Sequence, residues 1–283
     1  MNIQQLSQTL GSVKEDIEAA IVTASFDGRD CGNGQKAKEA LIRSSRLIFP
    51  IHELAKTSLD EVLRARGVHY RIHPPLGYSS PELHVTGFIK KKRQDIVVLI
   101  GNTQVHTEKV AEGPLQGTED ALGRKASETA IVIGVRSQLS SVGKNFDTLM
   151  ERAFAETLNL RLRLRNLVMG EIYLLPVFEY DDSAMKNNRV DFKRSPIGLE
   201  KFIRTFIGIS GRLPSATQDL YKYERSALIL ADFRTNPPDI YLTPAQLIKV
   251  GVDPDIAKMY PKLSPEGFAA DIINTHLERH RLS

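Results

Sequence analysis

The spacing of apolar residues predicts that the first third of the chain is helical. Apolar positions recur at intervals of three and four residues in residues 2–22, 35–48 and 52–66. The stretch 27–34, between the first two segments, is rich in Gly, Asp and Asn, and this composition indicates a loop. Gly67 follows the last apolar position of the third segment and is expected to end that helix.

After Val68 the pattern changes to short apolar runs that are typical of strands. We expect strands at residues 84–89, 95–100, 130–135, 171–180 and 227–233, and helices at 145–164 and 199–207. The run 130–135 is almost wholly apolar, as is expected of a central strand that is covered on both faces. Residues 102–127 have the composition of a loop, and prolines after Thr243 predict short helices in the tail.

This order of strands and helices predicts an α/β fold with a mixed central sheet flanked by helices and an N-terminal helical region. We divide the chain into a helical N-terminal region (1–67), a core (68–240) and a C-terminal helical segment (241–283). A chain of 283 residues can bury one large core, so we expect these parts to form one structural domain.

Composition narrows the class of protein. Apolar residues make up 41% of the chain and charged residues 25%, which is typical of a globular protein and argues against disorder. The net charge of +4 favours nucleic acid only weakly, so such binding must come from local patches. Cys31 is the single cysteine, which excludes an intrachain disulfide and a multi-cysteine zinc site. The first residues do not resemble a secretory signal and no apolar run is long enough to cross a bilayer, so we expect a cytoplasmic protein that does not bind membranes.

Two segments carry the candidate chemistry. Asp95 opens the apolar run 95–100, and Arg136 follows the run 130–135. An acid at the start of one strand and a cation at the end of the next can gather a carboxylate, a strand carbonyl and a positive charge around a divalent metal. Hydrolysis of a phosphodiester bond uses such a metal to orient and activate water.

At these residues the chain resembles the PD-(D/E)XK restriction endonucleases, and in particular those that cut CTCGAG. The shared features are, in order, Gly87-Phe88, Asp95 with its apolar run, Arg136-Ser137-Gln138, Asn145-Phe146 and Glu151. They cover residues 85–180. The resemblance implies a restriction-endonuclease-like core, Mg²⁺ as cofactor and type II, sequence-specific cleavage of double-stranded DNA. It also implies a companion DNA methyltransferase, and a palindromic target would require a two-fold symmetric homodimer.

The chain departs from the family pattern at two positions. Position 134, where the family has its second acid, is glycine and offers no side-chain ligand. Position 136, where the family usually has lysine, is arginine, which keeps the positive charge but presents a rigid fork instead of a compact ammonium. The site is therefore either inactive or uses a carboxylate from elsewhere in the chain.

Glu151, on the helix that follows the motif, is our candidate for the replacement acid, with Glu82 and Glu156 as weaker ones. We hypothesise that Asp95, Glu151 and the carbonyl of Val135 bind Mg²⁺, while Arg136 stabilises charge on the phosphate. Each residue also has a structural interpretation: Asp95 as a turn residue, Arg136 as an ion-pair partner and Glu151 as a solvated acid.

Basic and polar residues near the motif are candidates for contacts to the DNA backbone, because phosphate contacts position a duplex without reading its sequence. They are Lys90, Lys91, Lys92, Arg93, Ser137, Gln138, Ser140, Lys144 and Asn145. Farther along, Arg161, Arg163 and Arg165 alternate with leucines, and we interpret them as a helix end that stabilises the helix dipole.

Two other classes of protein stay open. One is a catalytically inactive DNA-binding or DNA-sensing protein that has the same fold, which the departures at Gly134 and Arg136 support. The other is an interaction or structural protein whose core only mimics the motif order. Binding to DNA that weakens as salt rises would separate the first class from the second.

Overall fold

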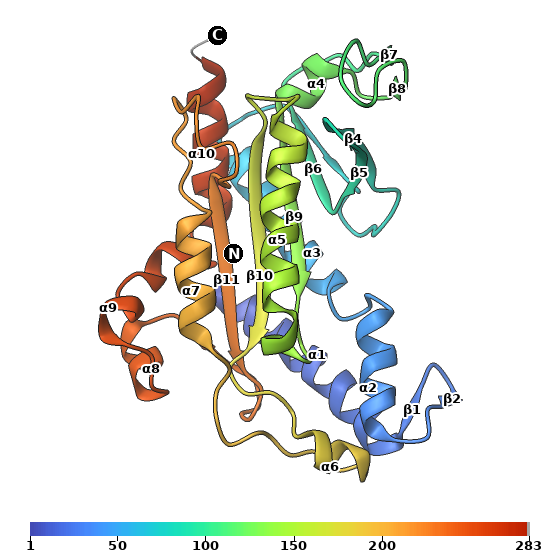
Figure 1. Cartoon of the computed structure of the whole chain (residues 1–283), viewed down its shortest axis with the longest axis vertical. Helices are drawn as coiled ribbons and strands as arrows, with labels where there is room; N and C mark the ends of the chain where they lie inside the picture. The colour runs from blue at the N-terminus through green and yellow to red at the C-terminus, as the bar shows by residue number, and fades with distance from the viewer. Residues whose placement is uncertain (282–283) are drawn as a thin grey trace.

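The computed structural model describes residues 1–281 and is built around a six-stranded mixed sheet (Figure 1). The strand order is β12-β11-β10-β9-β6-β3. β9 (Ala130–Ser137), β10 (Val168–Pro176) and β11 (Arg225–Asp232) are parallel to one another. β6 (Ile96–Ile100), β3 (Tyr70–His73) and β12 (Asp239–Tyr241) run antiparallel to their neighbours. The prediction of an α/β fold with a mixed central sheet flanked by helices is confirmed.

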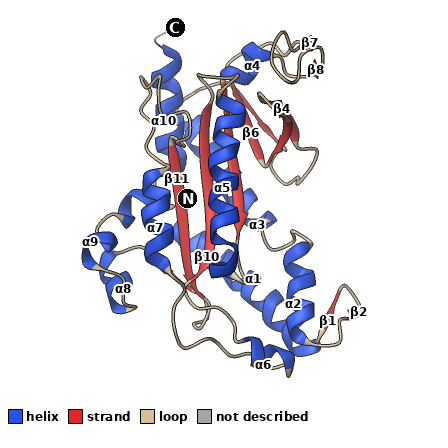
Figure 2. Ribbon diagram, viewed as in Figure 1, coloured by secondary structure: helices blue, strands red, loops and turns tan. Residues whose placement is uncertain are grey.

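Helices cover both faces of the sheet (Figure 2), because successive strand residues point to opposite sides and both sides are apolar. On one face Ile131, Ile133 and Val135 of β9 pack with α1 (Ile3–Thr23), α2 (Gly34–Arg43), α3 (Phe49–Ala65) and α10 (Phe268–Arg281). On the other face Ala130 and Val132 pack with α5 (Val142–Arg161), α7 (Leu199–Gly208) and the short helices α8 (Pro244–Lys249), α9 (Pro254–Ala257) and η1 (Tyr260–Leu263). The first of these clusters includes residues from all three ranges, 1–67, 68–240 and 241–283.

The three predicted N-terminal helices are present with shifted bounds. α1 begins at Asn2, whose side chain accepts hydrogen bonds from the N–H groups of Gln4 and Gln5 at 2.9 and 3.2 Å. α2 ends at Arg43, earlier than predicted, because Ser45 takes a φ of 62° that a helix cannot continue through. The chain then turns, and α3 starts at Phe49 with a proline in its first turn.

The cationic run 90–93 does not form a simple turn between two strands of the main sheet. β5 (Lys91–Gln94) pairs with β4 (Leu83–Thr86) as a separate antiparallel hairpin, so the predicted strand 84–89 is too long. The side chain of Asn159 on α5 holds the tip, where its Oδ1 accepts from the N–H groups of Ile89 (2.9 Å) and Lys90 (3.2 Å). A Cβ at Gly87 would lie 2.4 Å from the Asn159 side chain, so this close approach requires glycine.

Several elements were not predicted. The edge strands β3 and β12 are short, and each mixes buried and exposed positions, so neither gives a clear apolar run. The chain ends in one longer helix, α10, instead of only short ones. The remaining small elements are β1 (Ser25–Phe26), β2 (Arg29–Asp30), β7 (Glu108–Lys109), β8 (Glu119–Asp120), α4 (Arg124–Glu128) and α6 (Asp182–Lys186).

Arg161 is the last residue of α5, as the sequence predicts, and it is also part of a buried ionic cluster. It pairs with Glu224, which also accepts from Arg212 at 3.1 Å and from Arg279 at 2.7 Å. All four side chains are 5% exposed or less. The cluster fastens the end of α5, the loop before β11 and α10 to one another, so its role is structural.

Candidate active site

Asp95 lies in the bend between β5 and β6, at the end of the main sheet. Its Oδ2 accepts a hydrogen bond of 2.7 Å from the backbone N–H of Val135 on β9. β6 pairs with β9 from Ile96 opposite Ile133, and one further step in this register brings Asp95 opposite Gly134. The predicted acid and the predicted catalytic strand therefore meet.

On the side of β10, a carboxylate fills the space next to Gly134. In the register of β9 and β10, Glu171 is paired with Gly134, and the two residues point to the same face. A Cβ at Gly134 would lie 2.3 Å from Oε2 of Glu171 and 3.2 Å from its Cδ. The space that a side chain at position 134 would need is thus filled by an acid from the neighbouring strand.

Glu171 is fully buried, and neither of its oxygens takes part in a hydrogen bond with any residue in 1–281. Burial raises the pKa of Glu171 to about 7, with Glu156 and Asp95 adding to the rise and Arg136 opposing it. Burying an acid whose oxygens form no hydrogen bond costs free energy, which the charge of a nearby cation can offset in part.

Arg136 connects two carboxylates. Its Nε lies 3.2 Å from Oε1 of Glu171, and its Nη2 forms an ion pair with Glu156 of α5. Lys92 of β5 forms a second ion pair with Glu156. Burial lowers the pKa of Arg136, but Glu171 and Glu156 outweigh it and raise the pKa, so the guanidinium is held in its charged form.

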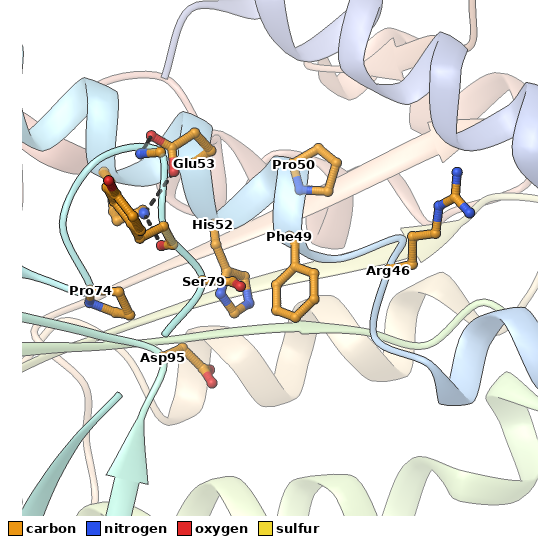
Figure 3. A pocket seen from close by; sticks show the side chains of 11 residues that line it. Arg46, Phe49, Pro50, His52, Glu53, Pro74, Ser79 and Asp95 are labelled. Atoms are coloured by element: carbon orange, nitrogen blue, oxygen red, sulfur yellow. Dashed lines mark hydrogen bonds and ion pairs between the residues drawn. The ribbon is translucent and has the colours of Figure 1, made fainter. Parts of the chain in front are cut away.

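His52 of α3 faces the same place from the opposite side of the sheet. Its Nε2 is buried and has no hydrogen-bond partner among the described residues. Burial lowers the pKa of His52, while Asp95 and the backbone of Val135 act in the opposite direction. The imidazole is therefore neutral at neutral pH. In Figure 3, His52 and Phe49 project from α3 towards Asp95.

Three adjoining cavities open around these residues. The central cavity has a volume of about 300 Å³ and is lined by His52, Lys92, Asp95, Arg136 and Glu156, among others. A second cavity of about 410 Å³ shares His52 and Asp95 with it, and a third of about 310 Å³ shares Val135 and Arg136. Together they form a groove that passes over the candidate chemistry, near the carboxyl end of β9, where ligands of α/β sheets often bind.

The structure brings some predicted site residues together and leaves one out. Asp95, Val135, Arg136 and the weaker candidates Glu82 and Glu156 line the central cavity. Glu151 is exposed on α5 and lines none of the three cavities. Five residues separate it from Glu156, which turns it about 140° around the helix.

The predicted DNA-contacting residues fall into two groups. Lys92, Arg93, Ser137 and Gln138 line the groove. Lys90, Lys91, Lys144 and Asn145 are exposed on the β4–β5 hairpin and on the first turn of α5, and Ser140 is half-buried before that turn. The side chain of Gln138 donates a hydrogen bond to the carbonyl of Ser140 and so stabilises the loop between β9 and α5.

Sequence reasoning missed Glu171 and His52. A signal for Glu171 was present, because an acid interrupts the apolar run 167–178 and a charge in a buried strand is rare without a partner. The sequence contains no such signal for His52, because a histidine on a helix gives no indication of the strand that it faces.

Few carboxylates at the site could serve as oxygen ligands for Mg²⁺. Within residues 1–281, no three His, Cys, Asp or Glu side chains form a group that could hold a metal ion. Mg²⁺ commonly uses only one or two protein carboxylates and keeps several waters. Asp95 at the central cavity and Glu171 beside Gly134 are the carboxylates that could meet this smaller requirement, although Glu171 lines none of the three cavities and its Oε1 is paired with Arg136.

No known protein family, no curated protein and no solved structure shows a significant match to this chain. In the part of the chain that the structure describes, no helix combines the length and apolar character of a membrane span.

Proposed function

We propose that this protein is a Mg²⁺-dependent endonuclease that hydrolyses phosphodiester bonds in double-stranded DNA. The observation that carries the proposal is the position of Glu171. It supplies a buried carboxylate where Gly134 leaves room, beside Asp95 and in contact with Arg136. The second acid that the motif lacks is thereby available from the next strand, and it takes the place that we had given to Glu151.

Asp95 at the central cavity and Glu171, which is buried behind the cavity wall next to Arg136, would hold Mg²⁺, and Val135 is a further residue of the cavity lining. The metal, when bound, supplies a Lewis acid for the phosphate and a water of lowered pKa. Arg136 and Lys92 are charged groups at the cavity wall that can stabilise the extra negative charge of the phosphate during attack. His52 is neutral there, so it can accept a proton from water without first losing one.

The groove and its surroundings suit a DNA backbone. Lys90 and Lys91 are exposed on the hairpin that also carries the lining residues Lys92 and Arg93, and Lys144 is exposed on the first turn of α5; phosphate contacts from such cations give affinity without sequence preference. Recognition of a specific palindromic site by a homodimer, and protection of the site by a companion methyltransferase, are part of the same proposal and rest on the family resemblance.

The test is cleavage of unmethylated phage and plasmid DNA by the purified protein with Mg²⁺. Asp95→Asn and Glu171→Gln remove one charge each with little change of shape and are expected to abolish cutting. Glu151→Gln is the matched control, an equal change at an exposed acid of α5, and should cut normally. Loss of cutting in Glu151→Gln but not in Glu171→Gln would refute our assignment. Thermal unfolding of each variant shows whether it is folded.

An inactive DNA-binding protein is the second candidate, and a specific observation favours it. Glu156 and Glu171 are already paired with cations, so part of the negative charge that would attract Mg²⁺ is neutralised within the protein. A wild-type protein that binds DNA with a steep salt dependence but cuts none with any divalent metal would identify this function.

A further inference from the structure

The second cavity of the groove has a feature that phosphate chemistry does not require. It adjoins Asp95 and is lined by two aromatic side chains, Phe49 and Tyr78, that are 38% and 65% exposed. Large apolar side chains are normally buried, because each gains free energy when it leaves water. Two exposed rings at the rim of one cavity are therefore a candidate binding surface.

The loop that carries Tyr78 is fixed by a buried cation. Lys56 of α3 is 2% exposed, and its ammonium donates to the carbonyls of Pro75 (2.9 Å) and Tyr78 (2.8 Å). Glu53 lies 2.6 Å from the same ammonium and accepts from the N–H of Gly77 at 2.7 Å. The backbone of Tyr78 and of the residues before it is thus held while its ring stays in solvent, and a binding surface fixed in advance loses less entropy when a ligand arrives.

The other aromatic wall belongs to the same helix as His52. Phe49 packs edge-to-face with His52, with ring centroids 5.8 Å apart and an interplanar angle of 87°. Figure 3 shows the two rings next to each other, with Asp95 below His52. A flat ligand in this cavity would also meet polar residues of its lining, namely Ser79, Asp95 and His52.

This cavity is large enough for a nucleobase, and its lining offers contacts that a base can use. About 410 Å³ lies within the range of roughly 300–1,000 Å³ that is typical of small-ligand sites. Every base has a π-face that stacks on aromatic rings and an edge that accepts and donates hydrogen bonds. Asp95 and His52 line both this cavity and the central one, so the two cavities adjoin and a nucleotide next to a phosphate in the central cavity would be within reach of this one.

We infer that the Phe49–Tyr78 cavity binds one unpaired base of the DNA strand whose phosphate lies at Asp95. The inference rests on the proposed function as far as DNA is the ligand, but it needs no cleavage. A base can enter only if it is unstacked from the duplex, so the protein would favour DNA with an extruded or unpaired base next to the bound phosphate.

The test measures binding without metal, in EDTA, by fluorescence anisotropy of labelled oligodeoxynucleotides. One probe is a duplex with a single unpaired base, and the other is the fully paired duplex of the same sequence. Tyr78→Leu and Phe49→Leu are expected to weaken binding of the first probe by about 5-fold to 100-fold, the range that stacking of one base supplies, and to leave the second nearly unchanged. Tyr78→Phe keeps the ring and should bind like the wild type.

Phe154→Leu is the matched control, because Phe154 is also an exposed aromatic residue, 42% exposed, but stacks on Tyr221 away from this cavity. A 2-aminopurine at the unpaired position gives a direct reading, since its emission should fall on binding to the wild type and not to Tyr78→Leu. Equal effects on both probes, or an equal effect of Phe154→Leu, would overturn the inference alone. A wild type that binds neither probe would overturn the proposed function together with it.

Discussion

The close approach of Glu171 to Gly134 predicts a strong energetic coupling between the two positions. In Gly134→Ala the new Cβ meets Oε2 of Glu171 at 2.3 Å and Cδ at 3.2 Å, and the three nearest atoms all belong to Glu171. Glu171 is fully buried and cannot swing into solvent. Forcing an extra methyl group into such a space costs about 1–3 kcal/mol of the free energy of unfolding.

The same substitution should raise the free energy of unfolding, instead of lowering it, once Glu171 is shortened. In the Glu171→Ala background the obstructing atoms are gone, and replacing a glycine inside a strand by alanine stabilises by roughly 0.5–1 kcal/mol. The coupling free energy between the two substitutions is the difference of these effects, about 1.5–4 kcal/mol.

Urea unfolding of the wild type, the two single variants and the double variant measures this coupling, provided that the slopes agree. Gly143→Ala is the matched control, because no heavy atom lies within 4 Å of a Cβ built at Gly143. Its effect should be the same with and without Glu171. If Gly134→Ala proved equally costly in both backgrounds, Glu171 would not lie over Gly134, and the assignment of Glu171 as the second acid would fail.

Three further predictions concern stability and order. Glu224→Gln removes the charge of the one acid among three buried arginines and should lower the free energy of unfolding in urea by about 3–5 kcal/mol. Asp147→Asn, which breaks an exposed ion pair, should lower it by less than about 1 kcal/mol. Burial lowers the pKa of His276 to about 4, so the unfolded chain binds a proton below its ordinary value of 6.5 while the folded protein does not. Stability should therefore fall as pH drops from about 6.5 towards 4, by up to about 3 kcal/mol, and unfolding of His276→Gln measured across this range should lack that loss. Asn159→Ala frees the tip of the β4–β5 hairpin and should speed trypsin cleavage at the lysines 90–92, and an Asn145→Ala variant that is cut equally fast would contradict this.

The parallel part of the sheet was predictable because its strands are long and apolar. β9, β10 and β11 are buried almost throughout, and such runs are read directly from the sequence. β3 was not predictable from the sequence, because only Ile72 of its four residues is buried. An edge strand of this kind is stabilised by pairing with its partner, β6. The strand predicted at 84–89 was too long for a related reason, since the hairpin of β4 and β5 is held by Asn159 from a helix far along the chain.

The candidate site was predictable only as far as it is local in sequence. Asp95 and Arg136 each lie at the end of an apolar run, which marks them without knowledge of the fold. The choice of Glu151 over Glu156 overlooked helical phase. Buried residues Ala153 and Leu160 mark the inner face of α5, and Glu156 lies on it, three residues after the first and four before the second, while Glu151 does not. Glu171 could be connected with Gly134 only through the register of two strands, which no short-range pattern contains.

The two departures from the restriction-endonuclease pattern are best understood as one change. Glycine at position 134 makes the space that Glu171 fills, and this brings a second carboxylate next to residue 136 in addition to Glu156. A lysine there would offer a single point charge, whereas the fork of Arg136 contacts Glu171 through Nε and Glu156 through Nη2. Arg136→Lys alone would leave one buried carboxylate without its partner, which is a costly state. The contact with Glu171 of β10 thus explains a fork-shaped cation at position 136, and under the proposed function an arginine there does not argue against catalysis.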